Sequence, residues 1–151
     1  MREVKLSDIA NRLGVKFNGD GVINKVVTDS RECTQGCLFI AIVGENSDGN
    51  SYTQKALENG AEAAVVSRIA DGVDPDRVML VADTKRAMIE IGGLYRDRFD
   101  IPFVGVTGSV GKTTTKEFVH AVLSAKYNTH KNEGNRNNEI GVPNTPIRTI
   151  P

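Results

Sequence analysis

The chain has no excess of charge of either sign and no long hydrophobic run, and each absence excludes a class of protein. Its 19 basic and 19 acidic residues give a formal net charge of zero, so no overall positive field favours nucleic acid or an anionic membrane. The longest apolar run, residues 38–43, is far shorter than the ~20 residues that a membrane-spanning helix requires. We therefore expect no nucleic-acid partner and no membrane insertion.

The N-terminus and the few cysteines point to an intracellular protein. Residues 1–5 read M-R-E-V-K and lack the apolar segment of a signal peptide, which predicts a cytoplasmic location. Cys33 and Cys37 are separated by three residues, and His120 and His130 lie far away in the sequence. This spacing fits neither a zinc site nor a thioredoxin-like motif. We interpret both cysteines as free, reduced thiols.

The most informative segment is F-V-G-V-T-G-S-V-G-K-T-T-T at residues 103–115, in which a short apolar run leads into a glycine loop. Gly108 and Gly111 can adopt positive φ angles, which lets successive backbone N–H groups point at a phosphate. Lys112 adds a positive charge, and the Thr113 hydroxyl is of the kind that binds Mg²⁺. Apolar residues at helical spacing follow, so the loop lies at a helix N-terminus, which favours anions.

These features predict a site for nucleotide phosphates and Mg²⁺. The common P-loop pattern has a glycine where this chain has Val106, and Gly105 stands one residue away. A glycine turn ahead of an ordinary helix is the alternative reading. Lys112 is the expected catalytic charge and Thr113 the expected metal ligand. The residues expected to bind the cofactor are Thr107, Gly108, Ser109, Val110, Gly111, Lys112, Thr113 and Thr114.

Ahead of this loop, strand-like and helical spacings of apolar residues alternate, which predicts an α/β fold. A helix capped by Ser7 and ended by Gly14 is expected first. Its sequence resembles the start of a DNA-binding helix-turn-helix, but β-rich residues 22–28 stand where the second helix should begin. The later expected strands are residues 38–43, 64–67 and 78–81, and the later expected helices are residues 52–59 and 84–99, the second capped by Asp83.

A break at Asp100-Ile101-Pro102 divides the chain into two predicted units. Residues 1–99 form a small N-terminal α/β domain, and residues 100–151 form the start of a P-loop ATPase-type α/β domain. In the second unit, strands are expected only at residues 103–107 and 127–129. A P-loop sheet needs more strands than these, so we interpret the second unit as truncated and the chain as part of a longer enzyme.

Three segments together resemble the Mur ligases, the ATP-dependent enzymes that build the peptide stem of peptidoglycan precursors. Residues 105–117 look like the family's own variant of the P-loop, which also accounts for the missing early glycine. The segment G-N-R-N-N-E-I-G-V-P at residues 134–143 is similar to one that distinguishes the D-Ala-D-Ala-adding branch. Residues 29–31, 36–49 and 60–66 look like the family's N-terminal domain, which holds the uridine end of the substrate.

The resemblance implies a ligase in which ATP phosphorylates the terminal carboxylate of UDP-N-acetylmuramoyl-tripeptide. The amine of D-Ala-D-Ala then displaces phosphate from the acyl phosphate. Residues 1–99 would be the UDP-sugar-binding domain, and the enzyme would be a cytoplasmic monomer of cell-wall synthesis, of which the 151-residue chain alone would not be competent. The implied substrate-binding residues are Ser30, Glu45, Asn46, Ser47, Asn135, Asn137 and Asn138.

Several alternatives remain beside this interpretation. Asn50 stands where the family more often has His, Arg136 where it often has Leu, and residues 144–151 replace what is usually a leucine-rich helix. Another ligase of the superfamily, of another Mur, folylpolyglutamate or cyanophycin type, is one alternative, and an ATP-binding regulatory module is another. Residues 29–31 would then be a turn ordered by local hydrogen bonds, and residues 132–138 a solvated loop.

Overall fold

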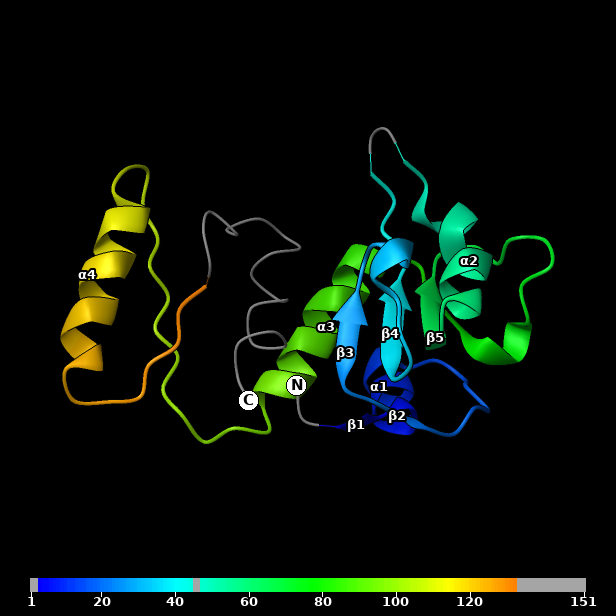
Figure 1. The fold of residues 1–151 in the computed structure, drawn as a ribbon, viewed down its shortest axis with the longest axis horizontal. Coiled ribbons are helices and arrows are strands. Elements are labelled where there is room, and N and C mark those ends of the chain that lie inside the picture. The colour runs from blue at the N-terminus through cyan, green and yellow to red at the C-terminus, as the bar shows by residue number, and fades with distance from the viewer. Residues whose placement is uncertain (1–2, 45–46, 133–151) are drawn as a thin grey trace.

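The computed structural model describes residues 3–44 and 47–132, and its main feature is a four-stranded parallel sheet (Figure 1). The strand order is β3-β4-β5-β6, so neighbours in the sheet are also neighbours along the chain. A separate two-stranded antiparallel sheet pairs β1 with β2. The strands are β1 (Val4–Lys5), β2 (Val22–Ile23), β3 (Lys25–Val27), β4 (Cys37–Ile40), β5 (Ala61–Val66) and β6 (Val78–Leu80).

Helices follow most of the strands, as the alternating pattern predicts, and the α/β fold class is confirmed. The strands and helices expected from residue 22 to residue 99 are present, with ends that differ by up to three residues from the predicted ones. The α-helices are α1 (Leu6–Leu13), α2 (Thr53–Glu58), α3 (Thr84–Arg96) and α4 (Lys112–Ser124). Three 3₁₀ helices complete the set: η1 (Ser30–Glu32), η2 (Gly49–Tyr52) and η3 (Pro75–Arg77).

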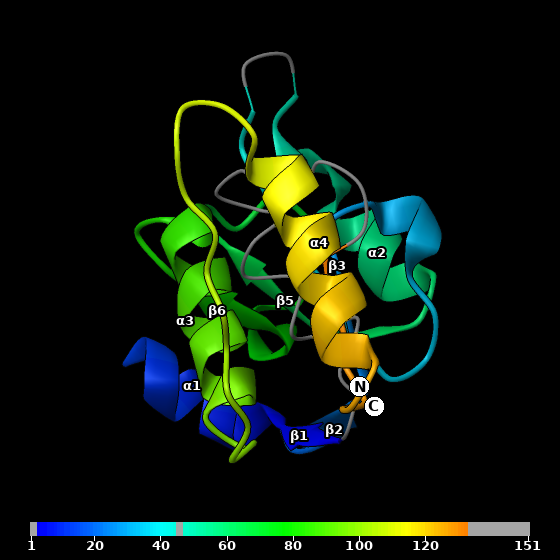
Figure 2. The same cartoon turned by 90° about the vertical axis from the view of Figure 1, so that its left-hand side faces the viewer.

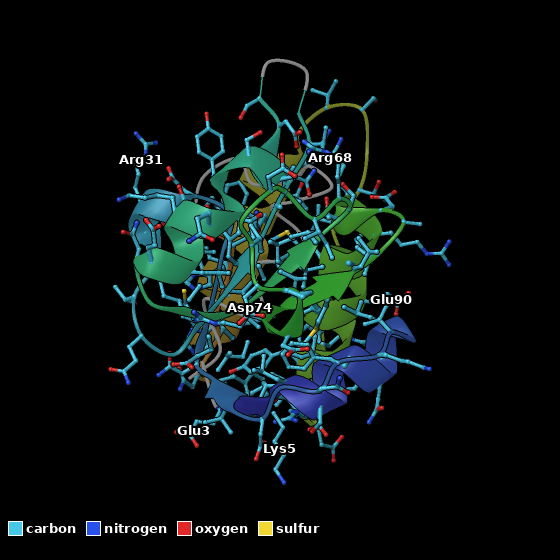
Figure 3. The ribbon with its side chains drawn as sticks, turned by 90° about the vertical axis from the view of Figure 1, so that its right-hand side faces the viewer. Glu3, Lys5, Arg31, Arg68, Asp74 and Glu90 are labelled. Atoms are coloured by element: carbon cyan, nitrogen blue, oxygen red, sulfur yellow. The ribbon has the colours of Figure 1, made fainter. Side chains whose placement is uncertain are left out.

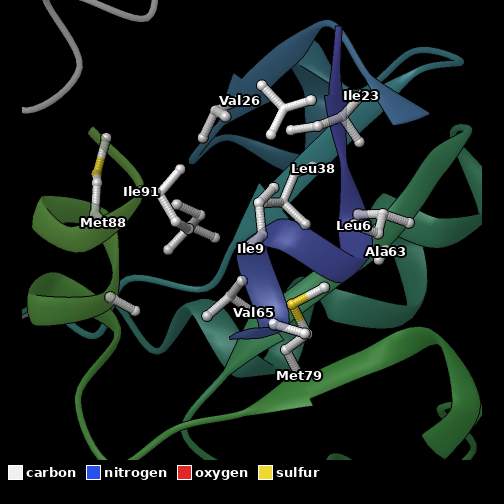
Figure 4. Close-up of a cluster of buried hydrophobic side chains, with 14 of the residues drawn as sticks. Leu6, Ile9, Ile23, Val26, Leu38, Ala63, Val65, Met79, Met88 and Ile91 are labelled. Atoms are coloured by element: carbon white, nitrogen blue, oxygen red, sulfur yellow. The ribbon is translucent and has the colours of Figure 1, made fainter. Parts of the chain in front are cut away.

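Two hydrophobic clusters cover the two faces of the parallel sheet, which gives three layers. Side chains alternate between faces along a strand, so Leu38 and Ile40 of β4 pack on the side of α1 and α3, whereas Cys37 and Phe39 pack on the side of α2. All four are at most 1% exposed. Figure 4 shows the first cluster, in which side chains of α1 and α3 meet those of the sheet. β4 is therefore the buried centre of the domain.

The ends of two helices test the predicted capping residues. The Asp83 carboxylate accepts hydrogen bonds from the backbone N–H groups of Lys85 and Arg86 and caps α3, as expected. Gly14 ends α1 in the left-handed conformation with φ 68°, also as expected. The expectation that Ser7 caps α1 is wrong. The helix begins at Leu6, because β1 runs directly into it and the Leu6 N–H is already bonded to the Gly21 carbonyl at 3.0 Å.

Residues 100–132 are built differently from the rest of the described chain. Every residue of the two buried clusters lies between Val4 and Tyr95, and α4 contains no buried residue. α4 stands apart from the sheet in Figure 1, and Figure 2 shows the molecule with α4 toward the viewer. The strands expected at residues 103–107 and 127–129 are not formed, because no segment among the described residues pairs with them. No described helix is long and apolar enough to cross a membrane.

We predict that limited proteolysis cuts first near residues 100–102 and leaves a stable fragment of residues 1–99. The physical reason is that the buried core ends at Tyr95, whereas residues 100–105 are exposed and in no helix or strand. Mass spectrometry of the fragments checks this prediction. Cleavage within residues 22–81, with no stable N-terminal fragment, would contradict the predicted domain boundary.

Candidate functional site

The loops that follow β3, β4 and β5 meet at one edge of the sheet, because parallel strands all end at the same side. The described residues on these loops are Asp29-Ser30-Arg31, residues 41–44 and 47–50, and Ser67-Arg68. Figure 3 shows Arg31 and Arg68 toward this end of the domain and Glu3 and Lys5 at the opposite end. The edge therefore gathers polar groups from three parts of the chain that are distant in sequence.

After β3, a short polar turn is held by one carboxylate. Asp29 accepts from the backbone N–H of Arg31 at 2.9 Å and caps η1. The Arg31 guanidinium donates to the same carboxylate through Nε at 2.9 Å and Nη2 at 2.6 Å. These contacts are the local hydrogen bonds that would order residues 29–31 as a turn. Asp29 and Arg31 therefore have a structural role whether or not a ligand binds beside them.

The same contacts change the acidity of Asp29. The Arg31 side chain and backbone N–H stabilise the carboxylate, and they lower the pKa of Asp29 from 3.8 to about 2. The Arg31 side chain is 87% exposed, so its outer face remains open to solvent. Ser30 between them is only 8% exposed, and its carbonyl accepts from the Asn59 side chain at 2.9 Å.

After β4, the chain turns back on itself. Val43 and Asp48 form an isolated antiparallel bridge, and the Gly44 N–H donates to the Ser47 carbonyl at 2.8 Å. A side chain at Gly49 would place Cβ 2.5 Å from the Ile42 carbonyl oxygen, so only glycine allows this close return. Ser47 is exposed at the sheet edge.

Asn50 fixes this turn to the next strand, and sequence reasoning missed it as a functional candidate. Its side chain is 2% exposed and bonds to Asp48, Ser67 and the backbone of Arg68. The contact between Asp48 and the Asn50 backbone could have been predicted from the local pattern Asp-x-Asn, in which the carboxylate accepts from the N–H two residues later. The contact between Asn50 and Ser67, 17 residues away, could not be predicted from local sequence.

The structure describes only two of the expected substrate-binding residues. Ser30 and Ser47 both lie on loops at the carboxyl edge of the sheet, after adjacent strands. Glu45, Asn46, Asn135, Asn137 and Asn138 lie outside the described residues. Ser30 has little exposed surface, so a ligand at this edge would meet Arg31 and Ser47 more directly.

The glycine loop before α4 has the backbone geometry that a phosphate site requires. Gly108 has φ 149° and Gly111 has φ 79°, both in the range that favours glycine. Gly111 is the residue before α4 and no side chain caps the helix there, which leaves the first backbone N–H groups of α4 without a side-chain acceptor. The Thr115 N–H closes the first turn on the Gly111 carbonyl at 2.9 Å.

Lys112 folds back across this loop. Its Nζ atom donates to the Gly108 carbonyl at 2.6 Å, so the ammonium group lies against the loop. The residues around it that are expected to bind the cofactor are exposed, and Val110 is 90% exposed. Three features therefore meet at this loop: the charge of Lys112, the N-terminus of the 13-residue helix α4, and two glycines at positive φ.

No group of three or more His, Cys, Asp or Glu side chains that could hold a metal ion occurs within residues 3–44 and 47–132. A metal held by one hydroxyl and by phosphate oxygens needs no such group. Thr113, the second residue of α4, is exposed beside Lys112. The residues present therefore fit a Mg²⁺ ion bound together with a nucleotide.

The two cysteines are buried and free, as expected. Burial and the neighbouring Cys37 raise the pKa of Cys33 to about 12. A thiol with so high a pKa stays protonated at neutral pH and is a poor nucleophile or metal ligand. Both side chains belong to the hydrophobic cluster on the α2 face of the sheet.

We predict that Asp29→Asn lowers the thermal unfolding midpoint at neutral pH and that this difference disappears in acid. The folded-state pKa of Asp29 is depressed to about 2, so its stabilising effect is present above the unfolded value of about 3.9 and is lost as pH falls toward 2. Circular dichroism melts of both proteins from pH 7 to about pH 2 measure this. A difference that stays constant over the whole range would show that the Asp29 carboxylate does not stabilise η1.

Comparison with known protein families gives two matches. Residues 106–148 match the Mur ligase middle domain, and residues 22–93 match the catalytic domain of the Mur ligase family. The first match contains most of the glycine loop, and the second contains the loops at the sheet edge.

Curated relatives show the same similarity. The chain is 48% identical over 130 residues to the UDP-N-acetylmuramoyl-tripeptide--D-alanyl-D-alanine ligase of Synechocystis sp., a match that covers 85% of this chain and 29% of that protein. It is 40% identical over 152 residues to the ligase of the same name from Escherichia coli, with 100% of this chain and 33% of that protein covered. The chain thus spans about a third or less of the length of these relatives.

Solved structures agree with the sequence comparison. MurF from Acinetobacter baumannii superposes with a TM-score of 0.87 at 29% identity, covering 97% of this chain and 33% of that one. MurF ligase from Thermotoga maritima, in complex with ADP, gives a TM-score of 0.76 at 36% identity over 82% of this chain and 28% of that one. Because the two family matches together extend over most of the chain, the protein belongs to the Mur ligase family.

Proposed function

We propose that this chain is part of an ATP-dependent ligase that adds D-Ala-D-Ala to UDP-N-acetylmuramoyl-tripeptide through an acyl phosphate. The curated relatives carry the name of this activity. The observation in this chain that supports it most directly is the loop from Gly108 to Gly111, with both glycines at positive φ and Lys112 closed over it.

The chemistry explains why such an enzyme needs a phosphate site. A carboxylate is a poor electrophile, and phosphorylation of its oxygen turns that oxygen into part of a leaving group. The γ-phosphoryl group of ATP passes to the carboxylate oxygen, ADP leaves, and the amine then forms the amide while phosphate departs. In phosphoryl transfer, positioning and charge neutralisation provide most of the catalysis.

Different residues of the loop would bind the phosphates, neutralise their charge and hold the metal ion. The backbone N–H groups from Thr107 to Thr114 would bind the phosphate oxygens, helped by the N-terminus of α4. Lys112 would exchange its bond to the Gly108 carbonyl for the β- and γ-phosphates and neutralise their charge. Thr113 would hold Mg²⁺, which supplies Lewis-acid stabilisation of the phosphate charge when bound.

The sheet edge in the first 99 residues would bind the uridine end of the substrate. Ser47 and Arg31 are exposed there, and Arg31 already carries a fixed orientation from Asp29. Ser30, Glu45 and Asn46 would complete this region. Asn135, Asn137 and Asn138 would lie near the reacting carboxylate. We infer a cytoplasmic, monomeric enzyme, in keeping with a UDP-linked precursor as substrate.

We predict that Lys112→Ala weakens ATP binding by the 151-residue chain by about tenfold or more, since a charge-assisted bond to phosphate is lost. Isothermal titration calorimetry with MgATP measures the dissociation constant. Lys126→Ala is the matched control, because Lys126 lies just after the far end of α4, about 20 Å along the helix axis from Lys112.

The two variants separate a local effect from a general one. Lys126→Ala should bind MgATP as the unchanged chain does. If Lys112→Ala also binds MgATP with an unchanged dissociation constant, Lys112 has no part in nucleotide binding and the assignment of this loop is wrong.

A further inference from the structure

The side chain of Asn50 joins two loops of the sheet edge through both ends of its amide. Its Nδ2 group donates to Asp48 Oδ1 at 2.7 Å and to Ser67 Oγ at 3.0 Å. Its Oδ1 atom accepts from the backbone N–H of Ser67 at 3.0 Å and of Arg68 at 3.3 Å. Both donors and the acceptor are thus used, at a residue that is 2% exposed.

Asp48 extends this network toward the surface. Its carboxylate also accepts from the Asn50 backbone N–H at 2.9 Å and from Arg68 Nη2 at 2.7 Å. These contacts, with Arg68 the largest, lower the pKa of Asp48, so it is ionised at neutral pH. Asp48 therefore receives a hydrogen bond from each of two loops, the one after β4 and the one after β5.

The network holds the position of Ser47. Asp48 is the direct neighbour of Ser47 and pairs with Val43, and the Ser47 carbonyl accepts from Gly44. A buried amide that loses its partners has a high cost, because its polar atoms no longer reach water. Val43, Ser47 and Asp48 are consequently held in one position relative to the end of β5, and Asn50 links them to it.

We propose that Asn50 is a positioning residue for nucleotide binding at the sheet edge: through Asp48 it presents Ser47 to the uridine diphosphate part of the substrate. This inference rests on the proposed function, since it assumes that the edge binds a UDP-linked compound. It adds a residue that does not touch the ligand and that acts through the geometry of its neighbours.

The test breaks the Asp48–Asn50 contact from each side in turn. Asn50→Asp removes the Nδ2 donors and sets a second carboxylate against Asp48, so Ser47 should lose its fixed position. Asp48→Ala removes the carboxylate that accepts from Asn50 and Arg68 and leaves the Asn50 amide in place. Ser67 and Arg68 N–H groups keep an acceptor in both proteins.

UDP and MgATP binding to the 151-residue chain are measured by isothermal titration calorimetry, with thermal melts of every variant. For Asn50→Asp we expect the dissociation constant of UDP to rise about tenfold and that of MgATP to stay the same. Asp48→Ala should raise the dissociation constant of UDP by a similar factor, about tenfold, and should also leave that of MgATP unchanged. Asn18→Asp, an exposed residue outside the edge, controls for the added charge, and Ile91→Val in the core controls for lost stability.

The outcomes separate this inference from the proposed function. Unchanged UDP affinity in a less stable Asn50→Asp protein would show that Asn50 is only structural and would overturn the positioning role. Weakened UDP binding in Asn50→Asp but not in Asp48→Ala would also overturn it, because the Asp48–Asn50 contact would not be the cause. If the unchanged chain binds MgATP but not UDP, the proposed UDP site is wrong and the inference falls with it.

Discussion

Parallel pairing of β3 to β6 is the constraint on which the structure of residues 3–99 depends. A parallel strand cannot follow its neighbour through a tight hairpin, so each connection crosses over one face of the sheet and both faces must be covered. β4 shows the result, because its four residues are buried and alternate between the two clusters. The same pairing brings the polar loops after β3, β4 and β5 to one edge.

Burial of apolar side chains, rather than charge, provides most of the stability of this arrangement. An ion pair of Arg12 with Glu90 joins α1 to α3, and one of Asp8 with Arg98 joins α1 to the residues just after α3. The side chains of the first pair are 39% and 36% exposed, and such pairs contribute about 0–1 kcal/mol. Ile9 and Ile91 between the same helices are at most 2% exposed, and each fully buried side chain of this kind contributes about 1.5–3 kcal/mol.

The ion pairs are therefore better understood as orienting contacts. Gly93 of α3 illustrates this, because a Cβ there would lie 3.2 Å from Arg12 Nη2. A small residue at this point lets the guanidinium cross the helix to reach Glu90 and Asp97. The buried cluster brings α1 and α3 together, and the charged groups select how one helix lies along the other.

Features that depend on neighbours in the sequence were predictable. The cap at Asp83 and the end of α1 at Gly14 follow from single residues, and the glycine loop before α4 forms because Gly108, Gly111 and Lys112 are close together. The prediction that Ser7 caps α1 was wrong, because the Leu6 N–H bonds to the carbonyl of Gly21, which is distant in the sequence. The strands predicted at residues 103–107 and 127–129 are not formed for a related reason, since a strand needs a partner strand that its own sequence does not specify.

The same distinction separates the two parts of the candidate site. The phosphate loop closes through a contact four residues apart, between Lys112 and Gly108, so its geometry exists although α4 has no buried residue. The sheet edge is different, since Asn50 reaches Ser67 across 17 residues and this contact exists only when β4 and β5 are paired.

Nucleotide phosphate binding should therefore tolerate damage to the core of the first domain, whereas the sheet edge should not. Loss of packing around β4 would separate the loops that carry Ser47 and Arg68 before it altered the loop at Gly108. In this chain the proposed recognition of a ligand at the sheet edge depends on the stability of the parallel sheet, whereas the proposed recognition of phosphate depends on local contacts around Gly108 and Lys112.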